Sequence, residues 1–449
     1  MNGFCWGPKE TRLLSMDQKE FARRRRQFMR MIGKDAIAVL PAAPVRHRNG
    51  DIEYAYRQDS QFYYLSGFPE PDAVAVLVPG RPQAEYLLFV REHDALRESW
   101  DGAWAGTDGA VDRYGADDAF PIADIDEILP GLMEQRSRIF YSMGTHLDFD
   151  PRMLGWAHGL RVHARQSSGA LQEFVALGHV LDDMRLYKSR AEQARLRRAA
   201  QIAIGAHRRA MRFARPGRME YEIMAEVLHE FRSHNADISY HPIIAGGANA
   251  CVMHYRANDR RLCEGDLLLL DAGCEHDYYA SDITRTFPVS GRFTPAQRAI
   301  YEVVLEAQLA AIDKVRPGNH WNQPHEAAVR AITHGLVKLG ILKGAVPRLI
   351  KEQAFLPFFN HRTGHWLGLD VHDVGDYKVG GEWRVLESGM ALTIEPGIYI
   401  RPSPRVPKEF WNIGVRIEDD LLVTHGDPEV LTAALEKAPE AVERMVRAA

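Results

Sequence analysis

Short apolar runs alternate with helix-like segments over the first part of the chain. The runs lie at residues 36–41, 73–80, 84–90 and 138–144, and each ends at glycine, proline or a charged residue, as buried strands do. Between and around them the apolar positions have the spacing of amphipathic helices. The pattern predicts an α/β domain that ends in the region 175–188.

The rest of the chain has long helices followed by apolar strands, and this order occurs twice. A helix is predicted to begin after Ser189, whose capping-box partner is Glu192, and to end before the Arg-Pro-Gly sequence at 215–217. A later helix begins after Thr294 and ends before a second Arg-Pro-Gly sequence at 316–318. A further helix and then strands follow each break. We interpret this half as two copies of one unit, with a chance recurrence as the alternative.

The length of 449 residues favours more than one domain, because one ordinary core does not extend over such a chain. We expect an N-terminal α/β domain at residues 1–180 and a second domain at 181–449. A helix is also predicted after Asp17, a suitable N-cap, and it contains the basic run Arg23–Arg26. We interpret that run as a solvated helix face rather than as a nucleic-acid or membrane patch.

The amino-acid composition and net charge restrict which broad class of protein we expect. Hydrophobic residues make up 46% and charged residues 26% of the chain, which is ordinary for a soluble globular protein. The net charge of −4 gives no reason to expect a nucleic-acid partner, and no apolar stretch is long enough to span a membrane. Four cysteines are too few for a disulfide framework, so we expect a reduced, cytoplasmic protein with buried free thiols.

Two aspartates stand where a buried strand is expected to end. The sequence "LLLLDAGCEHDYYASDITRTF" at 267–287 predicts a hairpin, and if its centre lies between His276 and Asp277, Asp271 is directly opposite Asp282. Two buried like charges repel and lose hydration, so they need a shared proton or a cation between them. The alternative is that one aspartate faces solvent or caps a turn.

Further ligand-type residues favour the cation. Glu395 interrupts the apolar run 390–400, Arg416 and Glu418 are two residues apart in 413–423, and three histidines lie in the Gly-interrupted stretch 360–375: His361, His365 and His372. Singly, each suits an ordinary turn, edge or core position. Together they form an oxygen-rich set with imidazole, which suits Mn²⁺ best, with Zn²⁺, Co²⁺ or Fe²⁺ as alternatives.

Four carboxylates balance two divalent cations, and such a pair activates a water molecule and polarises a carbonyl group. The chemistry predicted from the residues is therefore hydrolysis of an amide or ester. The chain has no G-x-S-x-G, Walker or G-x-G-x-x-G motif that would favour another chemistry.

Four sequences carry a resemblance to a known family: "DAGCEHDYYASDITRTF" (271–287), "GHWLGLDVHDVG" (364–375), "LTIEPGIYI" (392–400) and "GVRIEDD" (414–420). They resemble the motifs of the proline-specific aminopeptidases of metallopeptidase family M24, above all Xaa-Pro aminopeptidase. Residues 53–74 are similar to that family's N-terminal domain, and residues 184–199 to the entry into its catalytic domain. The resemblance implies an α/β (α+β) protein, in which a smaller N-terminal domain precedes a pita-bread catalytic domain with an internal pseudo-two-fold.

The resemblance also implies roles for individual residues. Asp282 and Glu418 would bridge two metal ions, and Glu395 would also act as general base towards the bridging water. His254, His361 and His372 would contact and orient substrate, with Arg416 close to the site and Trp100 reaching towards a substrate site. The implied set of metal ligands is Asp271, Asp282, His365, Glu395 and Glu418. One local departure is "HRTGHWLG", where Arg362 and Thr363 replace the smaller or apolar residues familiar in the family, which puts substrate preference in question there.

The implied activity is hydrolysis of the bond between an N-terminal residue and a following proline, by a dinuclear enzyme of the cytoplasm. Its partners would be peptides with proline at the second position, with no nucleic acid or membrane, and the chain would assemble as a dimer or tetramer. The alternatives are prolidase, which cleaves only Xaa-Pro dipeptides, and a non-catalytic pita-bread scaffold. Methionine aminopeptidase is disfavoured because it does not usually carry such a long N-terminal domain.

Overall fold

The computed structural model describes residues 16–163 and 171–448, and the chain divides after Met184 into two compact units. The first unit is built on a six-stranded mixed sheet in the order β6-β5-β4-β1-β7-β8. Its strands are β1 (Ala36–Pro41), β4 (Val74–Leu77), β5 (Tyr86–Val90), β6 (Asp118–Pro121), β7 (Arg138–Phe140) and β8 (Glu173–Val175). The four strands predicted in this region are confirmed, three of them shorter than predicted.

Helices complete the first unit. One core joins alternate residues of the central strands, such as Ile37 and Val76, to Leu129 of α5 (Ile125–Met133) and Met153 of α6 (Asp150–His163). This alternation is what a strand with two covered faces requires. The remaining elements are α1 (Gln18–Ile32), α2 (Ser60–Ser66), α3 (Ala95–Asp101), α4 (Gly106–Asp112), α5 (Ile125–Met133), α6 (Asp150–His163), α7 (Gly178–Leu186) and the small hairpin β2 (His47–Asn49) with β3 (Ile52–Glu53).

The predicted helix after Asp17 is α1, and the Asp17 carboxylate caps it by accepting from the Lys19 amide at 3.0 Å. The interpretation of its arginines as a solvated face is wrong for two of them, since Arg24 is fully buried and Arg25 nearly so. Both guanidinium groups donate to backbone carbonyls, Arg24 to Tyr64 at 3.2 Å and Arg25 to Leu65 at 2.9 Å. Buried arginine is stable here because carbonyl oxygens and aromatic faces replace water.

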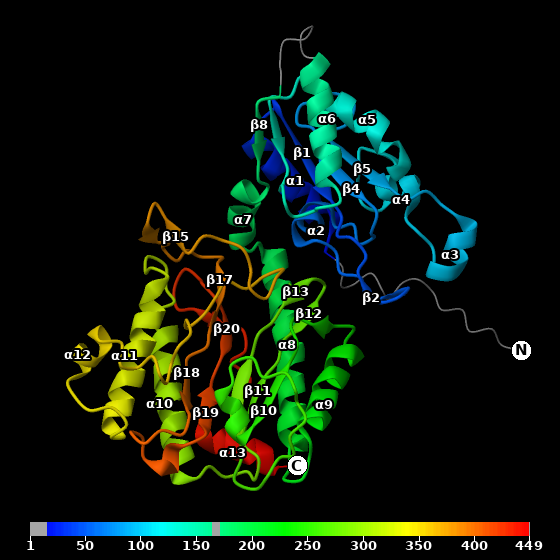
Figure 1. The fold of residues 1–449 in the computed structure, drawn as a ribbon. Coiled ribbons are helices and arrows are strands. Elements are labelled where there is room, and N and C mark those ends of the chain that lie inside the picture. The colour runs from blue at the N-terminus through cyan, green and yellow to red at the C-terminus, as the bar shows by residue number, and fades with distance from the viewer. Residues whose placement is uncertain (1–15, 164–170, 449) are drawn as a thin grey trace, which may run out of the picture. The chain divides into compact units, whose positions relative to one another are not determined.

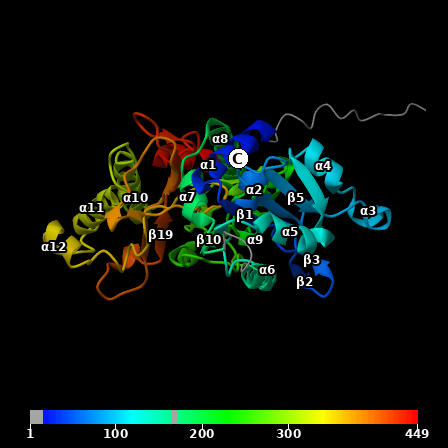
Figure 2. The same cartoon turned by 90° about the horizontal axis from the view of Figure 1, so that it is seen from above.

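The second unit contains two helix pairs, α8 (Arg190–Phe213) with α9 (Glu220–Ser233) and α10 (Pro295–Ile312) with α11 (Asn322–Lys338). Capping boxes at Ser189 and Thr294 begin α8 and α10, so both predicted helix starts are confirmed. Figures 1 and 2 show the strands of this unit between the two helix pairs. The order of helix pair followed by strands occurs twice, as the sequence predicts.

Each helix pair packs on its own set of strands. The first pair is followed by β9 (Asp237–Ile238), β10 (Ile243–Gly246), β11 (Leu267–Asp271), β12 (Cys274–His276), β13 (Tyr279–Ala280) and β14 (Thr284–Pro288). The second is followed by α12 (Val346–Lys351), β15 (Lys378–Val379), β16 (Glu382–Trp383), β17 (Ala391–Ile394), β18 (Gly397–Ile400), β19 (Ile413–Arg416), β20 (Asp419–Leu422) and β21 (Glu429–Val430), and the unit ends with α13 (Pro439–Arg447). Two separate apolar cores result, one under each helix pair.

The predicted hairpin forms, but its predicted register is wrong. The turn is centred on Asp277 and Tyr278, both with positive φ, so β11 pairs with β14 and Asp271 lies opposite Thr284 rather than Asp282. Two adjacent left-handed residues make the primed type of turn that suits a twisted hairpin. Asp282 falls in the break between β13 and β14.

Two other expectations concern the whole chain. Within residues 16–163 and 171–448, no helix has the length and apolar character to cross a membrane. Cys251 and Cys274 are buried free thiols, whereas Cys263 is exposed, so the interpretation of the cysteines as buried is wrong for Cys263. Cys5 lies outside the described residues.

Candidate metal centre

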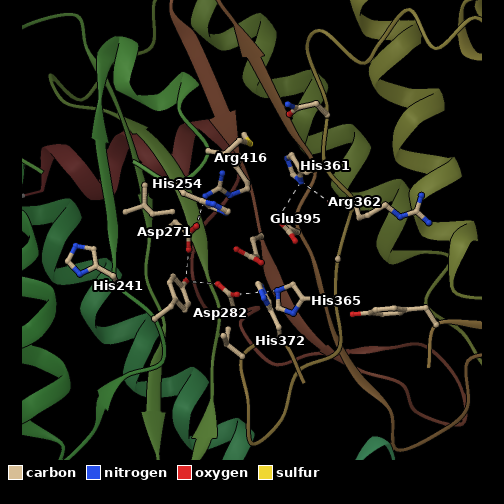
Figure 3. Close-up of a pocket in the computed structure, with 18 of the residues that line it drawn as sticks. His241, His254, Asp271, Asp282, His361, Arg362, His365, His372, Glu395 and Arg416 are labelled. Carbon is tan, nitrogen blue, oxygen red and sulfur yellow. Dashed lines mark hydrogen bonds and ion pairs between the residues drawn. The ribbon is translucent and has the colours of Figure 1, made fainter. Parts of the chain in front are cut away.

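A pocket of about 860 Å³ in the second unit is lined by residues from both of its halves. Tyr240, Asp271 and Asp282 come from the first half, and His365 and Glu418 from the second. Figure 3 shows the labelled acidic side chains converging on one region of this pocket, with His361, His365 and His372 beside them. The volume is in the range of small-molecule sites.

The four carboxylates stand where strands stop. Asp271 is the last residue of β11, and Asp282 precedes β14. Glu395 lies between β17 and β18, and Glu418 between β19 and β20. Because these positions are strand ends or breaks, the side chains reach the pocket while the neighbouring residues stay in the cores.

The two halves are joined next to these acids. The Glu418 amide donates to the Thr284 carbonyl at 3.0 Å, and the Thr284 hydroxyl donates to Glu418 Oε2 at 2.7 Å. The hydroxyl of Thr286 also donates to the Arg416 carbonyl, at 3.0 Å. The acids of one half are therefore fixed against those of the other by one backbone hydrogen bond and two threonine hydroxyls.

Three groups lie close enough to share one ion. Asp282, His365 and Glu418 offer ligand atoms that all lie within 4.8 Å of one another. Asp282 and Glu418 are buried, with 6% and 2% of their surface exposed. Carboxylate and imidazole at this spacing are a donor set for Mn²⁺ or another first-row divalent cation.

His365 is oriented as a ligand. Its Nδ1 lies 2.9 Å from the Trp366 carbonyl, which can only accept, so Nδ1 carries the proton and Nε2 faces the acids. Nε2 is 3.3 Å from Asp282 Oδ2. Metal-binding histidines characteristically donate their other N–H to a carbonyl or carboxylate in this way. Gly364 allows the loop to lie here, because a Cβ at that position would meet the Thr393 carbonyl oxygen at 2.0 Å.

Acidic side chains outnumber basic ones at the centre of the pocket. Burial, reinforced by the neighbouring acids, raises the pKa of Glu395 to about 7 and the pKa of Glu418 well above its usual range. Burial alone would lower the pKa of His365, but its contact with Asp282 and the charge of Glu395 raise it to about 9. The raised pKa values show that these groups need nearby positive charge, and a bound divalent cation can supply it in place of protons. The residues therefore fit divalent metal ions.

Arg416 organises the opposite side of the pocket. Its Nη2 donates to Asp271 Oδ2, and its Nη1 donates to the Tyr399 hydroxyl at 3.0 Å. That hydroxyl lies 3.0 Å from His361 Nε2, while His361 Nδ1 lies 2.8 Å from the Arg362 carbonyl. The carbonyl fixes the proton on Nδ1, so Nε2 accepts from Tyr399. Burial and Arg416 lower the pKa of His361 to about 3 and keep its ring neutral.

The other predicted site residues differ in their positions. His372 lies against His365 with ring centroids 4.3 Å apart, and burial followed by the charge of His365 lowers its pKa. His254 is exposed and lines the same pocket, near Arg416 in Figure 3. Trp100 is on α3 of the first unit with 84% of its surface exposed, and its predicted role in substrate binding remains a prediction.

Sequence reasoning missed Tyr240. The Tyr240 hydroxyl lies 2.5 Å from Asp282 Oδ1 and also donates to Asp271 Oδ1, so one phenol joins the two aspartates. Tyr240 precedes β10 in "ISYHPII", where a tyrosine suits ordinary packing equally well. Only the tertiary fold brings it to the acids.

Comparison with known proteins identifies both units. Residues 194–425 match the model of metallopeptidase family M24, and residues 21–141 match the aminopeptidase P N-terminal domain. The chain is 43% identical to the Xaa-Pro aminopeptidase of Escherichia coli strain K12, over 97% of this chain and 99% of that protein. It is 34% identical to human Xaa-Pro aminopeptidase 3, over 96% of this chain and 86% of that protein.

Solved structures agree over 97% of the chain. The aminopeptidase PepP of Pseudomonas aeruginosa has a TM-score of 0.95 at 55% identity, covering 97% of this chain and 99% of that chain. A variant of Escherichia coli aminopeptidase P in complex with substrate has a TM-score of 0.93 at 42% identity, covering 97% of this chain and 99% of that one.

Proposed function

The chain belongs to metallopeptidase family M24, in the group of Xaa-Pro aminopeptidases, and on this premise we propose that it releases the N-terminal residue of peptides whose second residue is proline. The observation that carries the proposal is the convergence of Asp282, His365 and Glu418 at one pocket. Its N-terminal unit, which matches the aminopeptidase P domain, favours this activity over prolidase. The proposal assigns residues 1–180 to that domain and residues 181–449 to the catalytic domain.

Two divalent cations would be held by the five residues named by the family resemblance, and Asp282 and Glu418 would be shared between them: Asp271, Asp282, His365, Glu395 and Glu418. Mn²⁺ is our choice, because oxygen ligands with one imidazole suit it. Bound divalent cations supply Lewis-acid polarisation of a substrate carbonyl and lower the pKa of water. Four negative charges in a buried pocket balance two such ions.

Glu395 is the proposed general base. Its carboxylate lines the pocket beside the other acids, where it would accept a proton from water and return it to the leaving amine. His361 Nδ1 is 3.7 Å from Glu395 Oε2, so its ring is within reach of the same reacting region. Arg416 and Tyr399 hold that ring in place from the other side.

The three histidines that are not proposed ligands contact the substrate. His361 is neutral, with its Nδ1–H bonded to the Arg362 carbonyl, and the same nitrogen is 3.7 Å from Glu395 Oε2, which places the ring beside the reacting groups. His372 stands beside the ligand His365, and His254 is exposed to the pocket. We propose that they orient the peptide and carry protons between it and Glu395.

The test is a side-by-side assay of the purified, Mn²⁺-loaded chain. We expect hydrolysis of Xaa-Pro-Yaa tripeptides, little hydrolysis of their N-acetylated forms, much slower hydrolysis of Xaa-Ala-Yaa, and loss of activity with a chelator. Hydrolysis confined to Xaa-Pro dipeptides would favour prolidase instead. Bound metal without any hydrolysis would favour a binding scaffold. Sedimentation of the same preparation tests the proposed dimer or tetramer.

A further inference from the structure

Arg362 lines the same pocket as the acids but belongs to a different part of it. Figure 3 shows the neighbouring His361 and His365 directed towards the acids, whereas the Arg362 side chain extends away from them. Trp321, Tyr377 and Trp383 line the pocket as well. The pocket therefore continues from the acids to a region with aromatic rings and a cation.

Arg362 is held in a defined position. Its Nη2 donates to Asn322 Oδ1 at 2.8 Å, and its guanidinium carbon lies 5.0 Å from the centre of the Trp383 ring. The Asn322 amide nitrogen donates to Glu326 Oε1 at 2.6 Å, which fixes the amide so that its oxygen faces Arg362. Cation–π contact and one neutral acceptor orient a guanidinium without neutralising it.

In the described part of the chain Arg362 forms no ion pair, and Glu326, whose charge acts on it from a longer distance, accepts from Asn322 instead. Arg362 is exposed to the pocket, unlike the buried Arg185 and Arg285 of this unit, which pair with aspartates. A second cation, Lys378, lies 4.4 Å from the same Trp383 ring. Lys378 does not line the pocket itself, so Arg362 is the side chain that gives this part of it a positive charge, in contrast to the acids at the metal centre.

An enzyme that releases one residue holds only that residue on the N-terminal side of the cleaved bond. Everything else in the peptide extends to the other side, so the pocket beyond the metal centre contacts the C-terminal part of the substrate. A guanidinium with free N–H groups is the side chain best suited to bind a carboxylate there, through two parallel hydrogen bonds.

We propose that Arg362, positioned by Asn322 and Trp383, binds a carboxylate on the C-terminal side of the peptide substrate. This inference rests on the proposed aminopeptidase function. The carboxylate is either the free C-terminus of a short peptide or an acidic side chain after the proline. Arg362 is therefore a specificity-determining residue that favours short or acidic peptides.

The experiment compares matched substrates in the Mn²⁺-loaded enzyme. One pair is Xaa-Pro-Ala as free acid and as C-terminal amide, and the other is Xaa-Pro-Asp-amide and Xaa-Pro-Asn-amide. We expect kcat/KM to favour the acid in at least one pair by about tenfold, as for a charged hydrogen bond at a partly exposed site. In Arg362→Ala that ratio should fall to near one through a loss on the acid, and Arg362→Lys should retain part of it. Arg348→Ala, which removes an exposed arginine of α12, is the matched control and should leave both ratios unchanged.

If the acid-to-amide ratio of Xaa-Pro-Ala falls to near one in Arg362→Ala, the bound carboxylate is the C-terminus. If the ratio of Xaa-Pro-Asp-amide to Xaa-Pro-Asn-amide falls instead, the bound carboxylate is an acidic side chain. Equal rates on acid and amide in the unaltered enzyme, or ratios that persist in Arg362→Ala, overturn the inference but leave the aminopeptidase function standing. Failure of the unaltered enzyme to cleave any Xaa-Pro substrate overturns the proposed function, and this inference falls with it.

Discussion

Two groups of buried acids in the second unit behave in opposite ways. The first group, which we call the ligand acids because we propose them as metal ligands, consists of Asp271, Asp282, Glu395 and Glu418. The second group, the paired acids, consists of Asp373 and Asp419. Burial raises the pKa of Asp271, Glu395 and Glu418, yet the pKa values of Asp373 and Asp419 are lowered despite equal burial, because cations outweigh it.

The difference lies in the supply of cations. Asp373 has Arg185 at 2.5 Å and Lys188 at 3.0 Å. Asp419 has Arg285 and Lys437, each at 2.7 Å. The ligand acids share Arg416 and the imidazole of His365 among four carboxylates. Acids that pair with arginine and lysine side chains of the chain itself form a structural site. Acids that outnumber the cations around them form a site suited to metal ions.

Adjacent residues show the contrast most directly. Glu418 faces the pocket, whereas Asp419 faces Arg285, Lys437 and the amide of Gln308. Successive residues in extended backbone point to opposite sides, so two neighbouring acids serve two different functions. The paired Asp419 also anchors the backbone next to Glu418, because Arg285 donates to the Glu418 carbonyl at 2.6 Å.

The largest expected effect is on a ligand acid. Asp282→Ala removes a group that we assign to both metal ions, so metal stoichiometry should fall and kcat should drop by about 10³-fold or more, since metal ions stabilise transition-state charge by several kcal/mol. Metal analysis and kcat of the same preparation test this. A variant that keeps both metals and normal turnover would remove Asp282 from the ligand group.

The next effect separates a ligand histidine from a substrate histidine. His361→Ala should retain its metal ions and lose about 10²–10⁴-fold in kcat, as for a positioned proton-transfer group. His365→Ala should lose metal occupancy as well as turnover. If metal analysis gives the reverse, the roles of His361 and His365 are exchanged.

The helices, the strands and the positions of these four acids at strand ends could be predicted because their signals are local. Short segments of the sequence are enough to predict apolar strands, the acids at their ends, and the capping boxes at Ser189 and Thr294. The hairpin register could not be predicted from the sequence, because it depends on a turn at Asp277 and Tyr278. Tyrosine is not a residue that indicates a left-handed turn.

Residues whose partners are distant in sequence were also beyond prediction. Tyr240 joins Asp271 and Asp282 only after β11 and the segment before β10 come together. Arg24 and Arg25 resemble any solvated basic run until the carbonyls and rings that surround them are known. The contrast between the ligand acids and the paired acids has the same origin, since Arg185 and Lys188 precede Asp373 by most of the unit.

A matched pair of substitutions tests the contrast through stability. In metal-free protein at pH 7, Asp373→Asn should lower the free energy of unfolding by about 3 kcal/mol, because it leaves buried cations without their partner. The pKa of Asp373 is lowered, so its contribution is fully present above the unfolded value of about 3.8 and is lost only as the pH falls through the folded pKa. Asp282→Asn should lower stability by much less, since the loss of its contact with His365 is offset by the removal of one of several repelling charges. Urea unfolding of both variants measures this, and an equal loss in the two would mean that the acids do not form two groups.

The smallest expected effect is the stabilisation by the metal ions themselves. A metal ion that binds only the folded chain, at a free concentration 100 times its Kd, adds about 2.7 kcal/mol to the free energy of unfolding. A chelator should therefore lower the Tm of the unaltered protein by several degrees, and Mn²⁺ should restore it.

Two variants serve as controls. In Asp373→Asn the Tm with chelator should be lower than in the unaltered protein, but Mn²⁺ should raise it by the same amount, because this substitution leaves the ligand acids intact. Asp282→Asn should show little or no difference, since it lacks a ligand but not the fold. A metal-dependent Tm that Asp282→Asn retains in full would place the stabilising ions elsewhere in the molecule, whatever the activity of that variant.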